Sequence, residues 1–148
     1  MNTPQTAVEL LAQSSVTVDP HTFYLIGLRH DEWQRLLENP ELAPSGAQPY
    51  MVLRDRSETT LLLEESDWKT LRHTVRDARV EGDFRLLTFE LQLDWKVVGF
   101  LALVTGFLAA AEIPVGAISA FSRDHLMIKQ ADLAKTMIVL GEHVKEMC

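Results

Sequence analysis

The feature that most constrains this chain is an apolar run from Val97 to Ala111 that contains no charged residue. A membrane-spanning helix needs roughly 17–25 predominantly apolar residues, and here Glu112 and Pro114 follow a shorter run at once. We therefore predict a helix buried in a folded domain and no association with a membrane. Because the run is apolar on all sides, a sheet should cover one side and another layer or subunit the other.

The segments around this run predict strands. Leu87, Phe89, Leu91 and Leu93 alternate with polar residues, which is typical of a strand with one face in water. Two further strands are predicted at 115–121 and 126–128, followed by an amphipathic helix at 130–144.

The first half of the chain shows the same order of elements. We predict a strand at 21–28, a helix at 31–37, a hairpin at 50–54 and 58–64, and a helix at 67–76 capped by Ser66. Residues 1–15 contain a short helical pattern after Pro4, predicted to be a loosely packed lead-in. The order strand, helix, strand, strand, helix thus occurs twice.

This repeated order predicts an α+β fold of two ferredoxin-like (βαββαβ) halves, each with helices on one face of an antiparallel sheet. The expected division is a lead-in at 1–15, an N-terminal half at 16–82 and a C-terminal half at 83–148. The fourth strand of each half is not evident, and an exchange of strands between the halves remains open.

Composition excludes several classes of function. Lys and Arg number 14 against 21 Asp and Glu, and the net charge of −7 without a basic cluster argues against nucleic acid as a partner. Cys148 is the single cysteine, so neither an internal disulfide nor a multi-thiolate metal site is expected. Together with the lack of a signal-peptide pattern, this predicts a cytoplasmic protein.

No pattern typical of an enzyme occurs in the chain. The histidines are scattered without metal-ligand spacing, and there is no glycine-rich phosphate loop or nucleophile elbow. Asp124 and His125 are adjacent, and adjacent residues on a strand point to opposite faces, so their side chains cannot easily pair and a structural role in the hairpin is the better interpretation. We predict no catalytic residue, no metal and no cofactor.

Two stretches carry a resemblance to a known family. Residues 93–102 (Leu-Asp-Trp-Lys-Val-Val-Gly-Phe-Leu-Ala), followed by Ile113-Pro114-Val115 and 117–126, resemble the C-terminal half of small ACT-domain proteins of bacteria and fungi. They are similar to the branch that includes the arginine-sensing CASTOR proteins. The resemblance covers roughly residues 59–144 and implies a regulatory module that binds an amino acid, often at an interface between domains.

In that family the ligand lies against the turn between the first strand and the first helix. Carried over by the resemblance, the ligand-binding residues here are Asp94, Trp95, Lys96, Val97, Val98, Gly99 and, on the neighbouring strand, Ser119. Elementary chemistry supports such a site, because a helix N-terminus offers unpaired N–H groups to a carboxylate. Asp94 would accept hydrogen bonds from an ammonium group, and Gly99 would allow a close approach of the backbone.

Each of these residues also has a purely structural interpretation. Asp94 is a good N-cap for the helix that follows, and Gly99 would suit close packing of helix on sheet. Trp95 is bulkier than is usual in this turn, and would fill part of the pocket or anchor a core or an interface.

The sequence therefore leaves two functions open. The first is a regulatory module that binds a small ligand, an amino acid, and acts through a domain or subunit interface, with a homodimer as the expected assembly. The alternative is a constitutive interaction module that dimerises through the helix at 97–111 and binds no ligand.

Overall fold

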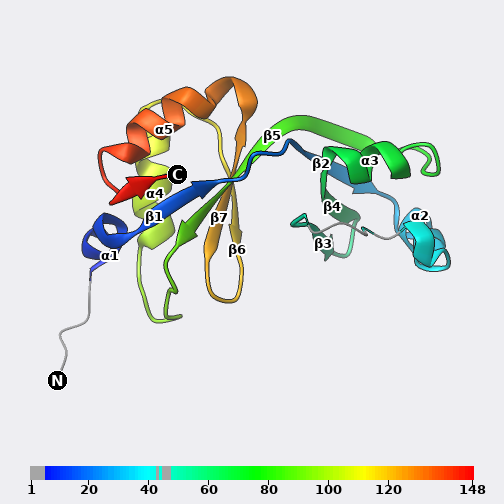
Figure 1. The fold of residues 1–148 in the computed structure, drawn as a ribbon. Helices are drawn as coiled ribbons and strands as arrows, with labels where there is room; N and C mark the ends of the chain where they lie inside the picture. Colours follow the sequence, from blue (N-terminus) through cyan, green and yellow to red (C-terminus); the bar gives the residue numbers. More distant parts are fainter. Residues whose placement is uncertain (1–5, 43, 45–47) are drawn as a thin grey trace. The chain divides into compact units, whose positions relative to one another are not determined.

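We describe a computed structural model of residues 6–42, 44 and 48–148 (Figure 1). The chain forms the following elements: α1 (Ala7–Gln13), β1 (Ser15–Val18), β2 (Phe23–Leu28), α2 (His30–Leu37), η1 (Pro40–Leu42), β3 (Met51–Arg54), β4 (Thr59–Glu64), α3 (Glu65–Leu71), β5 (Arg79–Glu90), α4 (Phe100–Ala110), β6 (Gly116–Ser119), β7 (Asp124–Lys129), η2 (Gln130–Asp132), α5 (Leu133–Gly141) and β8 (Glu146–Met147). This confirms the predicted α+β class. Pro4, named in the lead-in, lies outside the described residues.

The chain divides into two compact units, of which one interrupts the other. The split unit consists of Met1–Pro20 and Arg85–Cys148, and the inserted unit is His21–Phe84. The predicted halves, 16–82 and 83–148, differ from these units at the N-terminus, where α1 and β1 pack with the C-terminal part of the chain.

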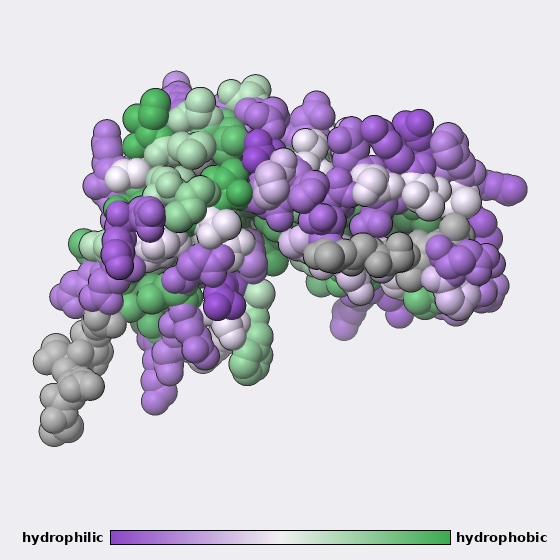
Figure 2. Space-filling view, in the orientation of Figure 1, coloured by the Kyte–Doolittle hydropathy of each residue, from purple (hydrophilic) through white to green (hydrophobic). Residues whose placement is uncertain are grey.

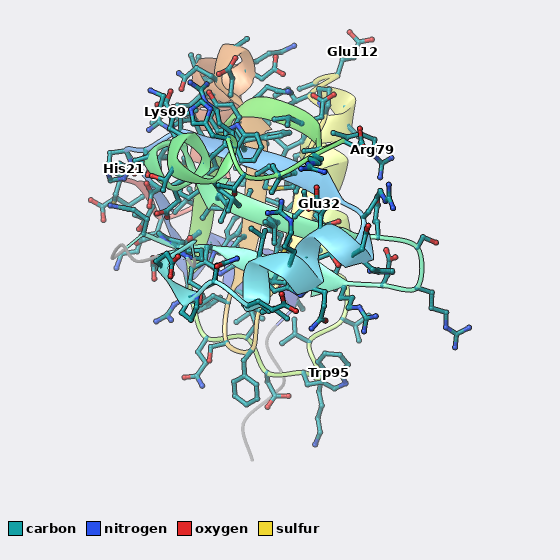
Figure 3. All side chains as sticks on the ribbon, turned by 90° about the vertical axis from the view of Figure 1, so that its right-hand side faces the viewer. His21, Glu32, Lys69, Arg79, Trp95 and Glu112 are labelled. Atoms are coloured by element: carbon teal, nitrogen blue, oxygen red, sulfur yellow. The ribbon has the colours of Figure 1, made fainter. Side chains whose placement is uncertain are left out.

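The inserted unit contains the order strand, helix, strand, strand, helix, strand. Its strands lie in the order β3-β4-β2-β5, all antiparallel, with residues 79–84 of β5 beside β2. Leucines of β4 pack with Trp68 of α3 and Leu36 of α2 in its core. Glu32 of α2, labelled in Figure 3, accepts a hydrogen bond of 2.7 Å from the Arg76 N–H and pairs with Arg35 at 2.8 Å, and the bond from Arg35 lowers the pKa of Glu32.

The split unit has the strand order β6-β7-β5-β1-β8, with α4 and α5 in contact with each other on one side of the strands (Figure 1). Residues 85–90 of β5 belong to this unit, so one long strand serves as the last strand of the inserted unit and as a central strand here. That is where the fourth strand of the first half, not evident in the sequence, is found.

The fourth strand of the C-terminal half is β8, but it does not lie beside β5. Instead β1 lies there, antiparallel to β5, with Val16 opposite Phe89, and β8 pairs parallel to β1. The sheet is therefore mixed, whereas the sequence predicted purely antiparallel pairing, because β1 takes the position that the last strand of a βαββαβ unit would occupy.

The lead-in is part of the core. Leu10, Leu11 and Val16 are 7%, 2% and 0% exposed and pack with Phe89 and the buried face of α4. The prediction of a loosely packed segment is wrong, because α1 begins with a full capping box, in which Thr6 caps the Glu9 N–H and Glu9 caps the Thr6 N–H, and its apolar side faces α4.

The apolar run forms α4, which begins three residues later than predicted. Phe100, Val104 and Leu108 are buried, Phe107 stacks on His143 at 3.7 Å, and Ala102, Gly106 and Ala109 are exposed. Within this chain the helix is thus not covered on all sides; the residues left uncovered are small. Among the described residues no helix has the length and apolar character that would cross a membrane.

The cap of α3 also differs from the prediction. The helix begins at Glu65, and the side chain of Glu64 accepts a hydrogen bond of 2.9 Å from the Ser66 N–H, so Glu64 and not Ser66 is the N-cap. The carboxylate of Glu64, two residues before Ser66, accepts from an N–H group of the first turn in place of the predicted cap.

Candidate functional site

Two loops meet at one end of the split unit. The loop between β5 and α4 and the β6–β7 hairpin project from the same end in Figure 1, and the Leu93 N–H donates a hydrogen bond of 3.0 Å to the Ser122 carbonyl. The hairpin closes with a bond of 3.0 Å from the Ala120 N–H to the Arg123 carbonyl. The N-terminus of α4 lies between the two loops.

These loops enclose an open cavity of about 410 Å³, a volume in the range of small-molecule sites. Its wall is formed by the strand-to-helix loop, the first turn of α4 and the hairpin: Leu93, Asp94, Trp95, Val97, Gly99, Phe100, Leu101, Ala102, Ser119, Ala120, Phe121, Ser122, Arg123 and Asp124. Phe100, Leu101 and Ala102 are the first three residues of α4, whose N–H groups have no partner within the helix. The wall therefore includes the residues that carry these backbone donors, together with carboxylates and apolar side chains.

Asp94 stabilises the turn and does not cap the helix. Its carboxylate accepts a hydrogen bond of 2.8 Å from the Lys96 N–H, and the Val97 N–H donates to the Asp94 carbonyl at 3.0 Å. The interpretation of Asp94 as the N-cap is wrong, because the apolar run does not become helical until Phe100.

Gly99 is the N-cap of α4, and it has a left-handed backbone with φ of 84°. A Cβ atom placed there would meet no atom within 4 Å, so close packing of helix on sheet is not the reason for a glycine. The reason is the backbone conformation, which residues with a side chain rarely adopt. No side chain caps the helix at this position, so the first N–H groups of α4 have no side-chain partner from the N-cap residue.

Trp95 neither fills the cavity nor belongs to a core. Its side chain is 98% exposed and extends from the loop into solvent, as Figure 3 shows, while Phe121 on the opposite hairpin is 102% exposed. Both residues line the rim of the cavity. An exposed pair of large aromatic side chains at the mouth of a cavity is unusual for a single soluble chain.

The cationic side chain of the cavity wall is paired with a carboxylate, and the other charged side chains of the wall are acidic. Arg123 forms an ion pair of 3.1 Å with Glu90, while Asp94 and Asp124 contribute carboxylates to the wall. His125, next along β7, lies 2.8 Å from the Thr88 hydroxyl, and burial lowers its pKa. As expected from strand geometry, the side chains of Asp124 and His125 therefore have different surroundings, and no acid–base pair forms.

The structure places most of the predicted site residues at this cavity. Asp94, Trp95, Val97, Gly99 and Ser119 line it, whereas Lys96 and Val98, both exposed, do not. Sequence reasoning missed the hairpin residues Ala120–Asp124 as part of the wall. A short turn between two predicted strands after Ser119 was the available signal. Among the described residues no cluster of His, Cys, Asp and Glu could hold a metal ion.

The fold is of the α+β class, with ferredoxin-like units. Comparison with known proteins shows what the segment around the cavity is similar to. Residues 79–142, less than half of the chain, match the family model of the ACT domain. The matched segment begins at β5 and includes α4, the hairpin and α5, and thus the whole cavity. The sequence has no match among the curated proteins.

Solved structures share the fold across most of the chain. A protein from Agobacterium tumefaciens is 18% identical and has a TM-score of 0.72, with 92% of each chain covered. A Vibrio cholerae protein of unknown function, described as a possible transport protein, is 21% identical with a TM-score of 0.66 and coverage of 92% of this chain and 94% of that chain. The ligand-free regulatory subunit of aspartate kinase from Thermus thermophilus is 7% identical with a TM-score of 0.65. The match covers 89% of this chain and 99% of that subunit.

Proposed function

We propose that this protein is a cytoplasmic regulatory module that binds a free amino acid in the cavity at the start of α4. The observation that carries the proposal is the cavity itself: it lies where the ACT-like turn meets a helix N-terminus, and Trp95 does not fill it. The ACT match over residues 79–142 and the fold shared with an aspartate kinase regulatory subunit support a regulatory role. The two stretches that resemble the CASTOR-related branch support a place in it.

An amino acid has two groups that this cavity complements. Its carboxylate would accept hydrogen bonds from the N–H groups of the first turn of α4, helped by the positive end of the helix dipole. Its ammonium group would lie against the Asp94 carboxylate, with Ser119 as a further polar contact across the cavity. Both charges of the ligand would thus meet a complementary partner without a charged side chain of the protein being moved.

Occupancy would act by shifting populations between packings of two subunits, and we propose a homodimer as the working assembly. The loop after β5 and the hairpin are joined by a single backbone hydrogen bond, from Leu93 to Ser122. A ligand that bridges both loops would therefore stabilise the conformation in which they are close. No chemical step is required of the protein.

The test is the melting temperature in the presence of each of the twenty amino acids. We expect at least one to raise it, and Asp94→Ala to abolish the rise, because the ammonium group loses its carboxylate. A ligand at 100 times its Kd stabilises the folded state by about 2.7 kcal/mol, which gives a shift of several degrees.

Asp55→Ala is the matched control. Asp55 makes the same kind of turn in the inserted unit, where its carboxylate accepts hydrogen bonds from the Ser57 and Glu58 N–H groups at 2.6 and 2.9 Å. This variant should keep the ligand-induced rise. If no amino acid raises the melting temperature, or if Asp55→Ala removes the rise as Asp94→Ala does, the proposal fails.

The exposed side of α4 favours the alternative of a constitutive interaction module. Ala102, Gly106 and Ala109 form an uncharged strip of small residues, and apolar surface gathers over α4 and α5 in Figure 2. Such a strip permits close approach of a second helix. This alternative predicts self-association in sedimentation that no amino acid changes, whereas the regulatory module predicts a response to its ligand.

A further inference from the structure

The charged side chains at the cavity do not suit an acidic ligand. Arg123 is the one cationic side chain of the wall and is paired with Glu90 at 3.1 Å, while Asp94 and Asp124 make the remaining charge negative. An aspartate or glutamate side chain in the cavity would therefore face two carboxylates and compete with Glu90 for the guanidinium. This repulsion disfavours acidic amino acids.

Apart from Gly99, Ser119 and Ser122, the rest of the wall is apolar, and its two aromatic side chains that belong to the loops are exposed to water. Leu93, Val97, Leu101 and Ala120 contribute aliphatic surface, and Trp95 on the loop after β5 and Phe121 on the hairpin contribute aromatic side chains. The exposures of 98% and 102% mean that both aromatic side chains are surrounded by water. Covering them removes apolar surface from water, which is favourable by roughly 25 cal/mol for each Å².

On the basis of the proposed function, we infer that the ligand is an amino acid with a large apolar side chain, branched or aromatic, and that Trp95 and Phe121 determine this specificity. The main-chain groups of the ligand lie at Asp94 and the N-terminus of α4, and its side chain extends outward between the two aromatic rings. An apolar side chain gains from contact with both rings and requires no charged partner. Alanine and glycine reach neither ring, so they bind weakly.

The experiment is calorimetric titration of the full chain with leucine, phenylalanine, alanine, lysine and aspartate. We expect leucine or phenylalanine to bind about tenfold or more tightly than alanine, since each extra methylene in an apolar pocket contributes about 1–3 kcal/mol. Trp95→Ala and Phe121→Ala should each weaken the preferred ligand about tenfold and leave alanine nearly unchanged. Tyr50→Ala removes an aromatic side chain that is 53% exposed in the inserted unit, and should leave all affinities unchanged.

A second readout follows Trp95 directly. Trp33 and Trp68 lie in the core of the inserted unit, so Trp95 is the tryptophan most accessible to acrylamide. Binding of the apolar ligand should reduce quenching, and Trp95→Phe should remove this effect while the ligand still binds.

The outcomes distinguish a failure of the proposed specificity from a failure of the proposed function. Tighter binding of lysine or aspartate than of leucine and phenylalanine, or undiminished selectivity in Trp95→Ala and Phe121→Ala, overturns the specificity and leaves the amino-acid site intact. If none of these amino acids binds and the melting temperature responds to none, the proposed function itself fails, and the specificity fails with it.

Discussion

At the scale of single residues, the positions that matter most have roles that their neighbours determine. Asp94 and Asp55 both accept backbone hydrogen bonds from residues two positions ahead, and each lines a cavity: Asp94 at the start of α4, Asp55 beside His30 of α2. Each carboxylate stabilises its own turn, and what sets Asp94 apart is that its turn lies in the segment that matches the ACT model. The side chain alone does not distinguish the two.

His125 gives a prediction about pH. Burial lowers its pKa below the ordinary 6.5; Asp124 and Glu90 act in the opposite direction, and Arg123 in the same one. The unfolded state therefore takes up a proton at a higher pH than the folded state. The free energy of unfolding should fall as the pH drops below about 6.5, and it should be fully retained above that value.

Chemical denaturation of the wild type and of His125→Gln, at about pH 7.5 and at about pH 5.5, measures this effect. The variant should lose less stability between the two values. His73→Gln, which changes an exposed histidine of the inserted unit, is the control. An equal loss in wild type and His125→Gln would contradict the prediction.

The sequence predicted the turn better than the roles of its residues. Asp94, Gly99 and Ser119 do lie at one cavity, because a strand, a turn and an apolar helix fix the backbone path between them. The cap was assigned wrongly because Asp is a common N-cap, and a left-handed Gly99 is indistinguishable in sequence from a glycine chosen for packing. The exposure of Trp95 depends on the hairpin, which no local pattern specifies.

At the scale of elements, α4 shows glycine in two roles. Gly106 is in the helix interior, where a Cβ would meet nothing within 4 Å, while Gly99 requires φ of 84°. Gly106→Ala should raise the free energy of unfolding by roughly 0.5–1 kcal/mol, because alanine loses less backbone entropy in a helix. Gly99→Ala should lower it by about 1–2 kcal/mol through left-handed strain.

The two substitutions are identical in chemistry and lie seven positions apart, so each is a control for the other. Denaturant melts of both variants give the comparison. The same sign for both changes would show that backbone conformation is not what separates these glycines. A loss of stability in Gly106→Ala alone would indicate that the exposed strip of α4 is already in close contact with a second copy.

Elements with a long, regular pattern were predicted correctly, and those that depend on distant partners were not. The alternation at 87–93 identified the last part of β5, which begins at Arg79 and ends at Glu90, and the apolar run identified α4. The four residues of β1 were missed as a strand because they are too few for a pattern, and only their pairing with β5 and β8 makes them one. The same applies to the two residues of β8.

At the scale of the whole molecule, the folding of the split unit should depend on residues 1–20, whereas the folding of the inserted unit should not. Removal of residues 1–20 takes Leu10, Leu11 and Val16 from the core of the split unit and β1 from between β5 and β8. We expect residues 85–148 to lose their fold, and residues 21–84 to keep theirs, because that unit contains all four of its own strands.

A ¹H–¹⁵N spectrum of the truncated protein tests this. Amide signals of the split unit should collapse to random-coil positions, while those of the inserted unit stay dispersed. As point variants, Leu11→Ala should lower the free energy of unfolding by about 2–5 kcal/mol, whereas Val8→Ala, at a side chain that is 63% exposed, should change it little. Dispersed signals for residues 85–148 without α1 and β1 would contradict the expectation.

The shared strand β5 has a consequence for the protein as it leaves the ribosome. The inserted unit is complete once Phe84 has emerged, since residues 79–84 supply its last strand. By contrast, α1 and β1 are made before the inserted unit, but α1 packs against α4, and β1 pairs with residues 87–90 of β5 and with β8. Leu10, Leu11 and Val16 are therefore fully covered only after these later segments have been synthesised. The order of synthesis and the order of folding are therefore opposite for the first twenty residues, and this is the period in which the nascent chain most needs protection from aggregation.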